Sequence, residues 1–361
     1  MDKIGWGQLG IVLALSRIFS EAANFPQDDI TYGMQRFTVI ILSFVMLAAA
    51  LVPIMLLLRK YPGENLFGLC AKSSPAASRI LAVIFIIMIF TMMVSVTVQL
   101  EFYTSSTIFD AAPASLIIFF VIIACLYALL KGLPAVARTG VIIAGGFALL
   151  LILVVCGIGG SICIHYLYPA IIDTPKTLIP DILGEFSKNL EAATFAVLCS
   201  EVHEKAGKSL LLYVCLTLPT LLLMTFLYNS VLGEYLNVTS FPFYMLASLS
   251  DINLFQRLDG IDVIVWVMAA IIRLSLMTIA VQNACRNAFG NITASKITAA
   301  AVLILSGFAS FAFSRNTIDF VSFSALTGTG AALLVPVTIV PLICLIFASR
   351  KNKKRGKEQV K

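Results

Sequence analysis

Residues 80–100 read ILAVIFIIMIFTMMVSVTVQL, a run without a single charged side chain. A helix rises 1.5 Å per residue, so a helix of this length crosses about 30 Å of lipid hydrocarbon. The run is about twice as long as a strand of a membrane barrel needs to be. This stretch therefore predicts a transmembrane helix.

Similar apolar windows continue along the chain on both sides of this stretch. They lie at residues 6–25, 37–58, 80–100, 114–130, 140–164, 189–199, 210–232, 261–281, 298–313 and 321–347. Hydrophobic residues make up 60% of the chain and charged residues 12%, whereas a soluble domain carries about 25% charged residues. The sequence predicts an all-α integral membrane protein with ten transmembrane helices.

The basic residues predict how these helices are oriented. With both termini in the cytoplasm, 18 of the 25 Lys and Arg residues fall on the cytoplasmic side, as the positive-inside rule requires. Acidic residues, Glu185 and Asp262 among them, fall mainly outside. The basic tail after the last window favours contact with anionic membrane lipid, and nucleic acid is not an expected partner.

Metal, disulfide and catalytic sites are not indicated. The eight cysteines are scattered without a C-x-x-C pair, and the two histidines, His165 and His203, lie at helix ends. No H-E-x-x-H occurs, and no nucleophile is paired with a base. We expect neither an enzyme nor a cofactor.

The windows divide into two halves of five, at residues 1–164 and 165–349, followed by the tail at 350–361. Because five is odd, the second half enters the membrane in the opposite orientation, which is the inverted-repeat arrangement of transporters. The first window of each half is polar or short. Residues 16–21 contain three polar side chains besides Arg17, and the sixth window has only about eleven residues. Such positions predict interrupted helices that line a binding site near the midplane.

Charged residues inside the windows also indicate a binding site near the midplane. Arg17 and Glu21 are four residues apart and share a helix face, so that they either neutralise each other or contact a ligand. Arg273 has no acidic residue in its own window, so its partner lies on another helix or on a ligand.

Two further polar residues each allow two interpretations. Glu191 pairs with Arg273 or, as the macrodipole favours, occupies an exposed helix start. Thr194 donates to a solute or, more commonly in such helices, to its own backbone. The predicted substrate contacts are Arg17, Ser20, Glu21, Glu191, Thr194 and Arg273.

Motifs between the windows resemble those of the spore germination permease family, the B-type subunits of nutrient germinant receptors. They are RKYPGENLF at 59–67, the stretch 131–138, LIP at 178–180 with Gly184, FPF at 241–243, and FQRLD at 255–259 followed by Trp266 and Arg273.

This resemblance implies the amino acid/polyamine/organocation (APC) superfamily and a LeuT-like 5+5 fold, with a pocket between helices one, three, six and eight. It also implies unwound stretches at 16–22 and 191–195. Family members sense germinants such as amino acids in the inner membrane of bacterial spores, together with an A-type and a lipoprotein C-type subunit. This sequence departs from the superfamily at 17–21, where bulky and charged residues replace small ones.

The leading hypothesis is a permease-like subunit that binds a small, amino-acid-like solute and signals or transports it during spore germination. An ordinary secondary transporter of amino acids or other organic solutes is the alternative. The sequence is compatible with coupling to sodium, to protons or to neither.

Overall fold

The computed structural model describes residues 3–22, 34–107, 114–167, 175–203, 205–237, 239–251, 258–314 and 334–344. Every regular element in these ranges is helical. The α-helices are α1 (Trp6–Ala22), α2 (Met34–Lys60), α3 (Leu66–Ser73), α4 (Pro75–Thr107), α5 (Ala114–Lys131), α6 (Leu133–Gly157), α7 (Pro175–Ser187), α8 (Glu191–Leu198), α9 (Gly207–Leu227), α10 (Pro242–Leu249), α11 (Asp259–Phe289) and α12 (Ile292–Ser314). Short 3-10 or π turns are η1 (Gly159–Ser161), η2 (Ile164–Leu167), η3 (Cys199–Glu201), η4 (Tyr228–Leu232), η5 (Gly233–Asn237) and η6 (Val335–Ile339).

Six helical segments in the described ranges are long and apolar enough to cross a membrane: α2, α4, α6, α9 with its following turns, α11 and α12. Each predicted window contains helix. Of window 321–347 only residues 334–344 are described, and they are helical. The tail at 350–361 and the motif residues 255–257 lie outside the described residues.

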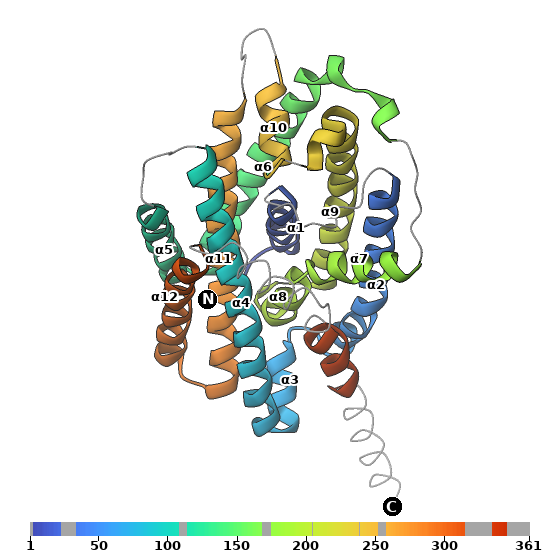
Figure 1. Cartoon of the computed structure of the whole chain (residues 1–361). Helices are drawn as coiled ribbons and strands as arrows, with labels where there is room; N and C mark the ends of the chain where they lie inside the picture. The colour runs from blue at the N-terminus through green and yellow to red at the C-terminus, as the bar shows by residue number, and fades with distance from the viewer. Residues whose placement is uncertain are drawn as a thin grey trace, which may run out of the picture.

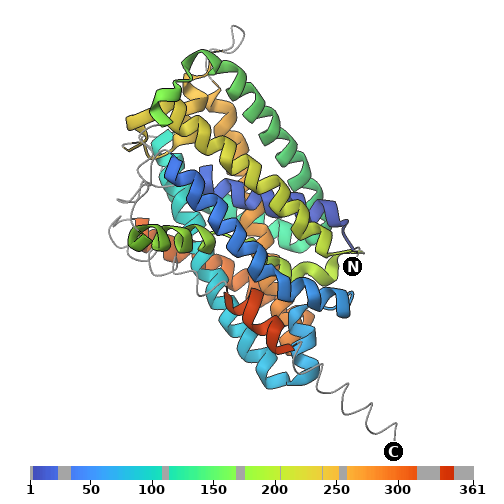
Figure 2. The same cartoon turned by 90° about the vertical axis from the view of Figure 1, so that its right-hand side faces the viewer.

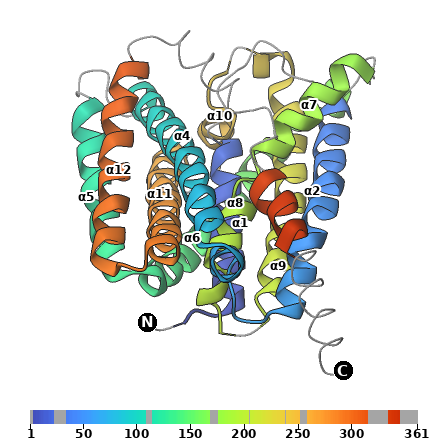
Figure 3. The same cartoon turned by 90° about the horizontal axis from the view of Figure 1, so that it is seen from below.

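The helices form two groups around α1, which lies at the centre in Figure 1. Figure 3 shows α4, α5, α11 and α12 together on one side and α2, α7 and α9 on the other, with α1 and α8 between them. In Figure 2 the blue α2 runs beside the olive α9. The second, third and fourth helices of the two sequence halves therefore fall in the same group as their counterparts, α2 with α9, α4 with α11 and α5 with α12.

Both predicted unwound stretches are wrong. Helix α1 is continuous from Trp6 to Ala22, and α8 is helical through residues 191–195. The break in the sixth window instead lies at residues 188–190, between α7 and α8. Polar side chains in α1 do not interrupt it, because their charges are matched by partners on neighbouring helices.

Three short helices were not predicted: α3, α7 and α10. Helix α7 contains Pro180 and has mixed polar and apolar residues, so it produces no apolar window. Its proline lies in the first half of the helix.

The 59–67 motif is the turn between α2 and α3. Gly63 adopts a φ of 82°, a left-handed conformation that glycine accepts without strain. The Asn65 side chain caps α3 by accepting from the Gly68 amide at 2.7 Å, and its amide donates to Ser200 at 3.2 Å. Leu66 and Phe67 are buried. The motif thus fixes the start of α3 beside η3.

Glycine lets α1 approach its neighbours closely. A Cβ at Gly10 would lie 2.8 Å from the Ser209 carbonyl oxygen on α9, whereas a Cβ at Gly7 would meet nothing within 4 Å. The α1–α9 contact therefore requires glycine at position 10 but not at position 7.

We expect Gly10→Ala to lower the melting temperature of the purified protein by several degrees, since overpacking against a backbone atom costs about 1–3 kcal/mol. Gly7→Ala, on the same helix, is the matched control and should leave the melting temperature unchanged or slightly higher. Equal effects of the two variants would contradict the close α1–α9 contact.

Candidate functional site

Arg17 lies in the second half of α1 and has no exposed surface. Its guanidinium forms a direct ion pair with Glu185 of α7 through Nη2, and its Nη1 lies 3.6 Å from Glu21 Oε2. The predicted Arg17–Glu21 pair is therefore present, but Glu185 is the closer partner. A charge at the centre of a membrane helix costs about 2.5–3.5 kcal/mol unless it is compensated, which this pairing achieves.

Arg36 of α2 completes this group. Its Nη2 donates to Glu21 Oε1 at 2.9 Å and to Glu185 Oε2 at 2.8 Å. Lys188 Nζ lies 3.3 Å from Glu185 Oε2 at the half-exposed edge. Arg17, Glu21, Arg36, Glu185 and Lys188 form what we call the charge cluster, which joins α1 to α2 and α7.

A second group of polar side chains joins α1 to α8 and α11. Arg273 Nη2 lies 3.3 Å from Glu191 Oε1, and its Nη1 donates to the Ser16 carbonyl oxygen at 3.0 Å. The Ser16 hydroxyl donates to Glu191 at 2.8 Å. Glu191 is 2% exposed, so the favoured prediction of an exposed helix start is wrong and its alternative, the pair with Arg273, is present.

The hydroxyls of the two remaining predicted residues, Ser20 and Thr194, form hydrogen bonds within the protein. The Ser20 hydroxyl accepts from Arg17 Nη1 at 3.1 Å and donates to the Arg17 carbonyl at 2.7 Å. The Thr194 hydroxyl donates to the Leu190 carbonyl at 3.4 Å, the backbone interaction that sequence reasoning favoured. All six predicted residues are thus brought close to the junction of α1, α7, α8 and α11.

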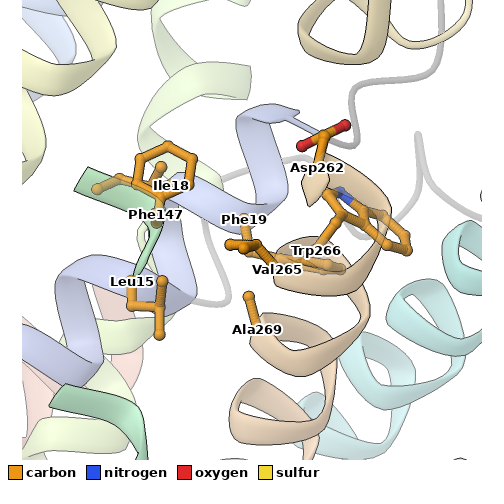
Figure 4. Close-up of a pocket in the computed structure, with 8 residues that line it drawn as sticks. All are labelled: Leu15, Ile18, Phe19, Phe147, Asp262, Val265, Trp266 and Ala269. Carbon is orange, nitrogen blue, oxygen red and sulfur yellow. The ribbon is translucent and has the colours of Figure 1, made fainter. Parts of the chain in front are cut away.

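A small pocket with a cavity volume of about 10 Å³ lies beside this junction, between α1, α6 and α11 (Figure 4). Its walls are mainly apolar. They are formed by Leu15, Ile18, Phe19, Phe147, Asp262, Val265, Trp266 and Ala269. Positions 262, 266, 269 and 273 follow helical spacing and share one face of α11, so Arg273 lies about one turn beyond the pocket.

Aromatic rings close one side of the pocket. Trp266 packs on Phe19 with a centroid distance of 4.6 Å and stacks on Tyr103 of α4 at 3.9 Å. The Tyr103 hydroxyl donates to Asp262 Oδ2 at 2.7 Å. The Arg273 guanidinium also lies over the Phe19 ring, 5.7 Å from its centroid. Phe19 therefore contacts both a wall of the pocket and the arginine of the Arg273–Glu191 pair.

Sequence reasoning missed Arg36, Glu185, Lys188, Tyr103 and Asp262. The first three and Asp262 were assigned to outer loops and window edges, where charge is ordinary. One available signal was the helical spacing of Asp262 with Trp266 and Arg273.

The N-terminal end of α1 is held at a separate contact. The Ile4 amide donates to the Glu201 carbonyl at 3.0 Å, and the His203 amide donates to the Ile4 carbonyl at 3.1 Å. Glu201 also pairs with Arg286 near the end of α11. This contact, which we call the terminal latch, ties the segment before α1 to η3 and α11.

Comparison with known protein families agrees with this arrangement of apolar helices. The family described as spore germination protein matches residues 30–318, well over half of the chain. The chain belongs to the spore germination protein family. No curated protein matched the chain. The resemblance seen in the motifs is confirmed, and the apolar helices together with the family identify a multi-pass membrane protein.

We expect Glu185→Gln to destabilise this spore germination protein by about 3–5 kcal/mol, because the variant leaves the buried Arg17 guanidinium without its closest countercharge. Lys188→Met removes a half-exposed member of the same cluster and should cost about 1 kcal/mol or less. Chemical denaturation in detergent measures both. Equal losses would show that burial of the Arg17–Glu185 pair is not what stabilises α1 and α7.

Proposed function

We propose that this protein is the solute-binding, permease-like subunit of a spore germinant receptor. The observation that carries the proposal is the pocket between α1, α6 and α11, which lies beside the junction of the first and sixth predicted windows. Ligand pockets are typically apolar with a few polar groups, and the walls of this pocket are of that kind. Because its cavity volume is about 10 Å³, the proposal requires the pocket to widen when a solute binds. Membership of the spore germination protein family supplies the biological context.

The proposed architecture is a ten-helix LeuT-like fold with two inverted halves at residues 1–164 and 165–349. Support comes from the grouping of helices, since α4 and α5 lie with α11 and α12, and α2 lies with α9. Repeats related by pseudosymmetry place corresponding helices in equivalent positions. We propose that the sixth helix consists of α7 and α8, interrupted at residues 188–190.

In the proposed orientation, both termini are cytoplasmic and the protein lies in the spore inner membrane. The terminal latch then closes the cytoplasmic side. The pocket lies nearer the start of α11, on the outer side. The solute enters from outside, and its binding shifts an equilibrium between outward-open and inward-open states. A-type and lipoprotein C-type subunits are the proposed partners that receive this signal.

Filling the pocket tests the proposal. Ala269→Phe places a ring in a pocket lined by a 4% exposed alanine, and we expect it to abolish complementation of nutrient-induced germination in spores that lack the gene. Met268→Phe, at the adjacent 48% exposed position, should complement fully. Loss of spore absorbance after addition of nutrients measures germination. Full germination with Ala269→Phe at normal protein levels would contradict the role of the pocket.

Loosening the terminal latch tests the proposed motion. Glu201→Gln weakens the pair with Arg286, so we expect the adjacent buried Cys285 to react several-fold faster with a maleimide. Site-resolved mass spectrometry measures the rate. Glu234→Gln, at an exposed position in η5, is the control and should leave Cys285 unchanged. An unchanged rate in Glu201→Gln would show that the latch does not close this side.

A further inference from the structure

Two buried cysteines from distant parts of the chain lie in contact. Cys70 belongs to α3, and Cys344 belongs to the helical segment 334–344, 274 residues later. Their sulfur atoms are 3.3 Å apart, and each residue is 8% exposed. All eight cysteines lie within the described residues and are free thiols, and this is the one pair among them whose sulfurs meet.

The sulfurs of two other buried cysteines are directed at the backbone instead. Cys125 donates to the Ile271 carbonyl at 3.6 Å, and Cys199 donates to the Glu64 carbonyl at 3.6 Å. A disulfide forms when one sulfur displaces another, so a thiol that already faces a second thiol is placed for that reaction. The contact between α3 and segment 334–344 therefore differs in kind from these two.

Both sulfurs are carried by helices that are anchored elsewhere. In α3, Phe67 is buried and its carbonyl accepts from the Ser78 hydroxyl at 3.1 Å. In segment 334–344, the Thr338 hydroxyl donates to the Ala50 carbonyl of α2 at 3.1 Å. Figures 1 and 2 show this red segment beside α2 and close to α3. The fold itself therefore holds the two thiols together.

A bond at this position would connect the last segment to the terminal latch. Helix α3 begins at the Asn65 cap, whose amide donates to Ser200 of η3 at 3.2 Å. Glu201, the next residue of η3, takes part in the terminal latch. A covalent link at Cys70 would thus join segment 334–344, α3 and η3 on one side of the protein.

The chemistry needs one oxidant of a common class. A disulfide bond is about 2.05 Å long, so the two sulfurs need to approach by about 1.3 Å. One thiolate attacks a small disulfide such as oxidised glutathione, forms a mixed disulfide and releases one small thiol. The second thiolate then displaces the other small thiol. The pair loses two protons and two electrons, and the small disulfide becomes two thiols.

We propose that Cys70 and Cys344 are a redox-sensitive modification site, at which a reversible disulfide fastens segment 334–344 to α3. In the proposed orientation, α3 lies on the cytoplasmic side, where small thiols keep cysteines reduced. The bond forms when this side becomes oxidising and is lost when small thiols are restored. The bond itself does not depend on a solute and goes beyond the proposed function.

The first test uses the wild-type full chain in lipid nanodiscs after reduction of its thiols. The protein is incubated with oxidised glutathione, free thiols are blocked with a maleimide, and linked peptides are measured by mass spectrometry. We expect the link between Cys70 and Cys344 to be about tenfold or more above any other link, since groups held in contact react at high effective concentration. A sample unfolded in detergent confirms that the oxidant is active. Absence of the link in the folded protein would overturn the proposal.

Variants then test the assignment of the two partners. Cys344→Ala should abolish the link. Cys199→Ala is the matched control, because Cys199 is a buried thiol that also contacts the segment leading into α3, and this variant should leave the link unchanged. A link from Cys70 to Cys199, or between two chains, would overturn the assignment. If Cys344→Ala fails to fold, the linked peptides of the wild type still decide.

Thermal unfolding tests whether the bond fastens the segment. A cross-link between residues this far apart restricts the unfolded chain, so we expect the oxidised wild type to melt several degrees above the reduced form. Dithiothreitol should reverse the shift, and Cys344→Ala should melt at the same temperature in both buffers. Equal melting temperatures of the linked and the reduced wild type would contradict the fastening of segment 334–344 to α3.

Discussion

Charge pairing inside a membrane protein is the constraint on which this structure depends. Lipid and apolar side chains cannot solvate a guanidinium or a carboxylate, so each such group requires a partner from another helix. Arg17 meets this requirement through Glu185, and Arg273 meets it through Glu191. Because Arg17 belongs to α1 and Arg273 donates to the Ser16 carbonyl of α1, these pairs hold α1 against α7, α8 and α11.

This arrangement also creates the conditions for a binding site. With α1 held by the charge cluster and by Arg273, Phe19 is placed in contact with both Trp266 and the Arg273 guanidinium. The small pocket beyond Phe19 is then bounded by rigid elements rather than loops. Rigid placement favours precise recognition of a ligand, since less ordering accompanies binding. The same pairs that stabilise the fold therefore shape the proposed solute pocket.

The helical membrane fold was largely predictable, because an apolar window of about 20 residues is typical of a membrane-spanning helix. The charges within those windows were equally visible, and Arg17, Glu191 and Arg273 were found for that reason. The other members of the charge cluster were not, since Glu185 and Arg36 lie at helix ends where charge is common. The unwinding expected at residues 16–22 did not occur, because Glu185 and Arg36 compensate the charges that suggested it. Helix α7 escaped notice because its amphipathic sequence produces no apolar run.

A double-mutant cycle between Glu191 and Arg273 tests the central role of charge pairing most directly. The cycle compares Glu191→Gln, Arg273→Gln and the double variant with the wild type by chemical denaturation of the purified protein. Each single variant leaves one buried charge unpaired, whereas the double variant removes both. The account predicts a coupling free energy of about 1.5–3 kcal/mol. Additive effects within about 0.5 kcal/mol would contradict it.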